Sequence, residues 1–177
     1  MRDRKPKTAR GLVQSLAVVV GVAGVIYAFT AYDEDKDPIK TVDYSVELAT
    51  TRRAAPYPVA APQPGRLPDG WRATSVSYEP QSKVGAAWHL GFLDQDKQYV
   101  AVEQSDGRPA TFIDEVTQEA RATEKTQRIG GETWHRYAGP KYDALVHKGK
   151  GVTTVVTGTA SFAQLTKMAA ALQTEKG

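Results

Sequence analysis

The amino-terminal end of the chain is divided by charge into three parts. The first ten residues hold five basic side chains, the next 22 residues (Gly11 to Tyr32) carry no charge, and four acidic residues follow between Asp33 and Asp37. A helix of 22 residues spans about 33 Å, which is enough to cross a hydrocarbon core of about 30 Å. The sequence therefore predicts one transmembrane helix over residues 11–32.

The charges at its two ends predict the orientation of this helix. The basic tail, residues 1–10, is expected to stay in the cytoplasm, which places the rest of the chain on the outer side of the cell membrane. A cleaved signal peptide is an alternative, but the apolar run continues through Ile26, Tyr27 and Phe29 without a good small-residue cleavage site. A buried helix of a soluble protein is a further alternative. The length of the run favours a retained, single-pass anchor.

Small residues within this segment bear on association between helices. Ala17 and Gly21 lie four residues apart, as do Gly24 and Ala28. This spacing lets two helix backbones approach closely, although such pairs are frequent in any segment rich in alanine and glycine. We expect the lipid bilayer as one partner, and the spacing leaves a weak homodimer through this helix and chance pairing of small residues as the two alternatives.

The charge of the outer part argues against nucleic-acid binding. The chain has a net charge of +3, but the first ten residues contribute +4, and the remainder holds 18 Lys and Arg against 19 Asp and Glu. The basic excess therefore belongs to the topology signal, and no basic stripe is left for a nucleic acid. The sequence contains no cysteine, which excludes disulfides, thiolate metal sites and a cysteine nucleophile.

About 145 residues follow the predicted anchor, enough for one domain with its own core. We expect a spacer or stalk over 33–55 and an extracytoplasmic domain over 56–177. Residues 41–55 fit either a helix or an edge strand, because apolar residues recur at helical spacing but β-branched residues are frequent. Five prolines between Pro56 and Pro68 predict an extended strap laid across the domain, and they lack the P-x-x-P spacing of a docking peptide.

From Trp71 the apolar residues alternate, which is typical of strands. Three short strands are predicted by the alternation around Val76, around Trp88 and Leu90, and around Val100, with a polar turn at 94–96. Pro109 then begins a predicted helix with Phe112, Ile113 and Val116 on one side. The first half of the domain thus reads as a meander followed by a helix.

The second half repeats this plan. Gly130-Gly131 and Gly149-Lys150-Gly151 predict two hairpin turns, and Ser161 with Gln164 forms a capping box before a helix with Phe162, Leu165, Ala169 and Leu172 on one face. The expected fold class is α+β: an antiparallel sheet of about six to seven strands, in two similar halves, with helices on one face and one transmembrane helix in front.

Several sequence blocks resemble an actinobacterial family of membrane-anchored proteins known as domain of unknown function 4245. The similar blocks begin with Ala54-Ala55-Pro56-Tyr57-Pro58-Val59 and Leu67-Pro68-Asp69-Gly70-Trp71-Arg72 and continue at 87–92, 99–104, 130–134 and 155–161. The resemblance covers nearly the whole chain from about Val42. It implies a single-pass protein on the outer face of the cytoplasmic membrane, and it implies no activity, cofactor or site residue.

The three histidines are the first candidates for a chemical site. His89 and His135 each follow a tryptophan, and His147 lies twelve residues after His135. Zinc sites require three or four ligands that usually include a closely spaced pair, so we expect no metal site. If Trp88 faces the core, His89 points to the opposite side of its strand.

Other polar groups have adequate structural roles. Ser161 lacks the G-x-S-x-G context of a nucleophile and fits a helix cap. The turn at 149–151 lacks the glycine spacing of a phosphate loop. The pairs Asp94 with Asp96 and Asp114 with Glu115 are expected in solvated turns or at a helix start. We therefore predict no catalytic, cofactor-binding or metal-binding residue.

These observations predict a non-catalytic module of the cell envelope that binds or scaffolds another envelope or membrane protein. A lipid or small-ligand carrier is the alternative, and an envelope hydrolase a weaker one. An internal apolar cavity would favour the carrier. A pocket in which a histidine or a carboxylate pair meets other polar groups would favour the hydrolase.

Overall fold

The computed structural model describes residues 40–177, and residues 41–177 form one compact unit. The predicted cytoplasmic tail (1–10), the predicted transmembrane helix (11–32) and the first part of the predicted spacer lie outside the described residues. No helix within residues 40–177 has the length and apolarity needed to cross a membrane.

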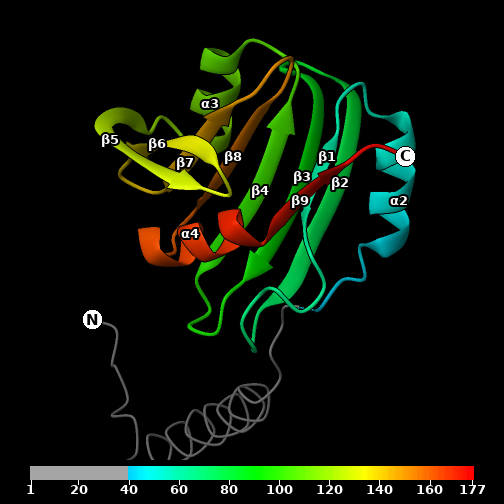
Figure 1. Ribbon diagram of the computed structural model, residues 1–177, viewed down its shortest axis with the longest axis horizontal. Helices are drawn as coiled ribbons and strands as arrows, with labels where there is room; N and C mark the ends of the chain where they lie inside the picture. The colour runs from blue at the N-terminus through cyan, green and yellow to red at the C-terminus, as the bar shows by residue number, and fades with distance from the viewer. Residues whose placement is uncertain (1–39) are drawn as a thin grey trace, which may run out of the picture. The chain divides into compact units, whose positions relative to one another are not determined.

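A seven-stranded antiparallel sheet forms the centre of this unit (Figure 1), with the strand order β2-β3-β4-β8-β7-β6-β5. Its strands are β2 (Arg72–Ser82), β3 (Gly85–Leu93), β4 (Tyr99–Ser105), β5 (Arg121–Ile129), β6 (Glu132–Ala138), β7 (Asp143–Lys148) and β8 (Thr153–Gly158). The helices are α2 (Ser45–Ala54), α3 (Pro109–Thr117) and α4 (Phe162–Ala171). Strands β1 (Val59–Pro62) and β9 (Leu172–Glu175) pair as a separate two-stranded ribbon. The α+β class and the antiparallel sheet are confirmed.

The sheet consists of two meanders joined at its middle. Strands β2, β3 and β4 follow one another, as do β5, β6, β7 and β8, and β4 pairs with β8 to connect the two sets. The predicted hairpin at Gly130-Gly131 joins β5 to β6, and both glycines have positive φ angles of 59° and 88°. Only glycine adopts two such angles in succession at low cost, so this pair determines where the chain reverses.

The helices cover both faces of the sheet, so the prediction of helices on one face is wrong. Helix α4 packs on the face that presents Leu145 and Val156, whereas Phe112 and Ile113 of α3 pack on the other face against Val155. Val155 and Val156 are neighbours in β8 and point to opposite sides. Both are fully buried. Central strands with consecutive apolar residues require cover on each side, and sequence alternation alone did not reveal this.

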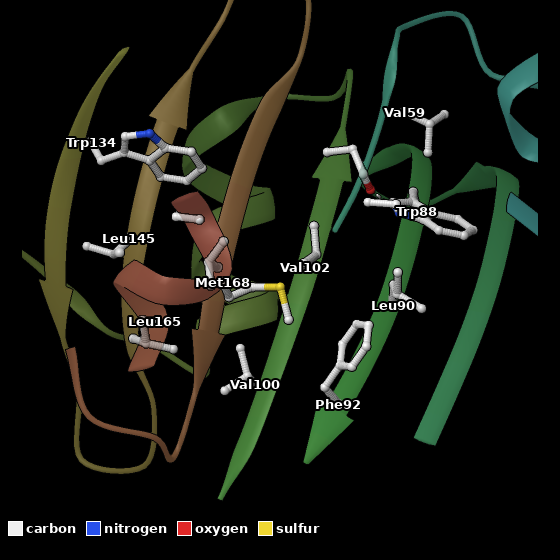
Figure 2. Close-up of a cluster of buried hydrophobic side chains, with 14 of the residues drawn as sticks. Val59, Trp88, Leu90, Phe92, Val100, Val102, Trp134, Leu145, Leu165 and Met168 are labelled. Carbon is white, nitrogen blue, oxygen red and sulfur yellow. Dashed lines mark hydrogen bonds between the residues drawn. The ribbon is translucent and has the colours of Figure 1, made fainter. Parts of the chain in front are cut away.

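The larger core lies between the sheet, α4 and the β1–β9 ribbon (Figure 2). It is filled by buried side chains that are at most 8% exposed. They include Val59, Trp88, Leu90, Phe92, Val100, Val102, Trp134, Leu145, Leu165 and Met168. The proline-rich strap crosses this core, and polar side chains of the sheet hold it there. Trp88 Nε1 donates to Ala60 O at 3.0 Å, and Ala60 N donates to Gln104 Oε1 at 2.6 Å.

Two segment boundaries differ from the sequence interpretation. Residues 45–54 form a helix of the compact unit, although the sequence interpretation assigns 33–55 to a spacer or stalk and leaves helix and strand open for 41–55. Tyr44 and Leu48 pack against the main core, and Val42 N donates to Ala73 O at 2.9 Å. At the other end, α4 stops at Ala171, and Leu172 begins β9 because its backbone pairs with β1.

Candidate functional site

Three polar side chains form a row across neighbouring strands on the sheet face opposite the strap. Ser75 lies on β2, His89 on β3 and Glu103 on β4, and each alternates with a residue that faces the main core. Ser75 Oγ lies 2.8 Å from His89 Nε2, and His89 Nδ1 lies 2.7 Å from Glu103 Oε1. A hydroxyl, an imidazole and a carboxylate are thus linked in the order found in catalytic triads.

The backbone around Ser75 creates space for this row. The pairing of β2 with β3 shifts between Ala73 and Ser75, so the strand has an irregularity next to the serine. Gly91 is the pairing partner of Ser75, and a Cβ there would lie 2.3 Å from Ser75 Oγ and 3.1 Å from the Tyr99 hydroxyl. Only glycine therefore leaves room for both hydroxyl groups above this strand.

Burial and mutual contact shift the acid–base properties of the row. Burial raises the pKa of Glu103 above its ordinary value, although the contact with His89 acts in the opposite sense. Burial by itself would lower the pKa of His89, but the hydrogen bond and charge of Glu103 outweigh it and raise that pKa. Burial, with the charges of Glu103 and Tyr142, raises the pKa of Tyr99, and a hydrogen bond with Ser75 opposes this rise. Tyr99 therefore keeps its proton at neutral pH.

The row remains accessible to solvent. The side chain of His89 is 28% exposed and that of Glu103 is 13% exposed, and Ser75 and Tyr99 are half-buried. Burying the charged carboxylate of Glu103 on a central strand costs free energy unless a hydrogen-bond donor or an opposite charge pairs with it. His89 supplies that pairing.

An open hollow of about 400 Å³ lies at the edge where the compact unit begins. Its lining includes Tyr44, Leu67, Trp71, Phe92 and the prolines of the loop between β1 and β2. The rings of Tyr44 and Phe92 meet edge to face at 5.8 Å, which sets one wall. The indole nitrogen of Trp71 is buried and has no partner within the described part of the chain.

The other two histidines do not join His89. His135 is exposed on β6, four strands away, which corresponds to about 19 Å at the usual strand spacing. His147 faces the opposite side of the sheet and packs on Trp134 with 5.5 Å between ring centroids. Within residues 40–177, no three His, Asp or Glu side chains are grouped so that they could hold a metal ion.

The remaining candidates have structural roles. Ser161 Oγ accepts the N–H of Gln164 at 3.4 Å and caps α4, as predicted. Residues 149–151 connect β7 to β8 as a turn. Asp94 is buried rather than solvated, because its Oδ1 accepts the N–H groups of Asp96 and Gln98 and so holds the turn. Asp114 and Glu115 are exposed within α3 and not at its start.

The sequence interpretation placed His89 on the correct side of its strand but missed its partners. Alternation from Trp88 predicts the direction of His89, and alternation from Val102 would have predicted that of Glu103. The two side chains come into contact because the register of β3 and β4 pairs His89 directly with Glu103. The position of Ser75 depends on the irregularity in β2, and no sequence signal marks it.

The family model described as "Protein of unknown function (DUF4245)" matches residues 4–172. No curated protein matches the chain.

Proposed function

The chain belongs to the DUF4245 family of proteins of unknown function, and we propose that it is a binding or scaffolding module of an actinobacterial cell envelope, anchored in the membrane by one helix. The cytoplasmic tail would be residues 1–10 and the anchor residues 11–32. The charge pattern of the first 37 residues supports this orientation. The partner would be another envelope or membrane protein.

The observation that carries the binding role is the open hollow near Trp71. Its walls combine aromatic rings, prolines and Leu67 with few charged groups, which is the usual character of a recognition site. Elsewhere on residues 40–177 the one strongly exposed large apolar side chain is Val46, at 75%. A partner that needs apolar contact would therefore find it in the hollow and not on a flat patch.

Thr41 and Val42 line the hollow, and eight residues separate Thr41 from Tyr32, where the proposed anchor ends. The hollow therefore lies where the chain enters the domain from the proposed anchor, which supports a membrane protein as the partner.

The packing of the interior favours this role over that of a carrier. An acyl-chain carrier needs an internal apolar cavity, and the main core of the described part is occupied by Trp88, Leu90, Phe92 and Met168, each at most 3% exposed. The hollow opens to solvent at the edge, and its shape suits a short segment of a partner.

Photo-crosslinking in living cells tests the proposal. A benzophenone amino acid at Leu67 places the reactive group in the hollow, and the same group at Val46 on α2 is the matched control. We expect a discrete adduct with one envelope or membrane protein from position 67 only, and loss of that adduct with Trp71→Ala. Absence of an adduct at position 67, or equal adducts at both positions, would contradict the binding role.

A further inference from the structure

We propose that Ser75, His89, Glu103 and Tyr99 form a second site, separate from the hollow, in which Ser75 is a nucleophile toward carboxylic esters. The site adds a chemical activity to the binding role and does not depend on it. Its four side chains come from three adjacent strands, β2, β3 and β4, so a rigid part of the sheet positions them.

The distances give each group a role. Ser75 Oγ is 2.8 Å from His89 Nε2, which is the geometry for proton transfer from the hydroxyl to the imidazole. His89 Nδ1 is 2.7 Å from Glu103 Oε1, and this contact holds the ring in the tautomer whose Nε2 can accept that proton. Glu103 is therefore a positioning residue that also stabilises the imidazolium.

Tyr99 supplies a donor beside the nucleophile. Its hydroxyl and Ser75 Oγ both lie above Gly91, where a Cβ would come within 3.1 Å of each of them. Burial raises the pKa of Tyr99, so its phenol keeps the proton that it would donate to a developing oxyanion. The ring centroid of Tyr142 lies 6.0 Å from that of Tyr99, so the two aromatic rings are neighbours.

The reaction balances without a cofactor. Ser75 Oγ forms a bond to the ester carbonyl carbon while its proton passes to His89 Nε2. The carbonyl oxygen becomes an oxyanion, to which the Tyr99 hydroxyl donates a hydrogen bond. The carbon–oxygen bond to the alcohol then breaks, and His89 returns the proton to the leaving alkoxide. Water, activated by His89, cleaves the acyl-serine in the second half and yields the carboxylic acid and free Ser75.

The surroundings of the row favour esters over amides as the substrate class. The row lies on a sheet face where His89 is 28% exposed, so its charges act in a partly solvated environment. The Tyr99 hydroxyl lies beside Ser75 Oγ above Gly91 and is the side-chain donor that we assign to the oxyanion. An alkoxide leaves more readily than an amine, so this arrangement suits esters better than amides.

The cost of the row supports a role in chemistry. The side chain of Glu103 is only 13% exposed, so its carboxylate loses most of its hydration. A hydrophobic residue at this position of β4 would fill the same sheet face without that desolvation cost. A glycine at position 91 also weakens β3, and it leaves room for the hydroxyl groups of Ser75 and Tyr99. Such local costs cluster at functional sites.

Labelling of the full-length protein with a fluorophosphonate tests the proposal directly. We expect one covalent adduct, located at Ser75 by peptide mass spectrometry. Ser77→Ala is the matched control, because Ser77 is on the same strand, is exposed and pairs with His89 in register. The adduct should persist in Ser77→Ala and vanish in Ser75→Ala. An adduct at another residue, or none in protein whose tryptophan fluorescence shows it folded, would overturn the assignment.

Hydrolysis of p-nitrophenyl acetate separates the roles of the other groups. His89→Ala should lower kcat at least about 100-fold, and Tyr99→Phe about 100-fold or more. Glu103→Gln should lower kcat and displace the pH profile, a result that a merely structural role would not give. Unchanged hydrolysis in His89→Ala would overturn the mechanism.

Normal labelling at Ser75 in Trp71→Ala, together with loss of the crosslinked adduct, would show that the two sites are independent.

Discussion

Gln104 joins the strap to the centre of the sheet, and its replacement by methionine should destabilise the domain. Its side chain is fully buried, accepts the N–H of Ala60 and donates to Thr154 Oγ1 at 3.0 Å. Methionine has a similar volume, so the change removes hydrogen bonds and leaves little cavity. A buried N–H without an acceptor costs about 1–3 kcal/mol, and the lost bond to Thr154 about 1 kcal/mol. We therefore expect a loss of about 2–4 kcal/mol.

Thermal unfolding of the full-length protein, followed by tryptophan fluorescence, measures this effect. For a compact unit of this size, 1 kcal/mol corresponds to about 3–4 °C, so Tm should fall by about 10 °C. Gln173→Met is the control, since Gln173 is exposed on β9 and its side-chain Oε1 accepts a hydrogen bond from Gln63 Nε2 at 2.8 Å. That change should cost less than about 0.5 kcal/mol. Equal Tm values for the two variants would refute the role given to Gln104.

Three further predictions concern the described domain. Because both Glu103 and His89 have raised pKa values, the folded state binds more protons than the unfolded state, and the free energy of unfolding should fall as pH rises from about 4.5 through the raised pKa of His89. Denaturant unfolding should show this slope flattened in a Glu103→Gln, His89→Gln double variant, and an unchanged slope would contradict it. Gly91→Ala should cost about 1–3 kcal/mol, because its Cβ would lie 2.3 Å from Ser75 Oγ, and a variant of wild-type stability would exclude that close approach. Ser161→Ala should cost about 0.5–1 kcal/mol in the same assay through loss of the α4 cap at 3.4 Å, and a variant of wild-type stability would contradict a stabilising cap.

The local elements could be predicted because their signals are local. Alternation identified β3 from Trp88 and Leu90, paired glycines identified the β5–β6 turn, and Ser161 identified the start of α4. The capping box is only half formed, however, since Gln164 Oε1 has no partner within the described residues. These features depend on a few neighbouring residues, which is why one sequence sufficed.

Features that depend on distant residues could not be predicted. The cover of both sheet faces, the pairing of β9 with β1 and the inclusion of α2 in the domain all depend on contacts across the chain. The same holds for the polar row, which requires the register of three strands and the irregularity before Ser75. Composition excluded cysteine chemistry and disfavoured a nucleic-acid partner, but it gave no indication of the row.

A reporter fusion tests the proposed placement of the chain, on which the binding role depends. Alkaline phosphatase is active only outside the cytoplasm, so its fusion after Gly177 reports the side of the membrane on which the domain lies. We expect high activity, and we expect it to fall when the five basic residues before Gly11 are replaced by glutamine. An inactive phosphatase fusion, together with a fluorescent cytoplasmic reporter at the same position, would contradict an extracytoplasmic domain.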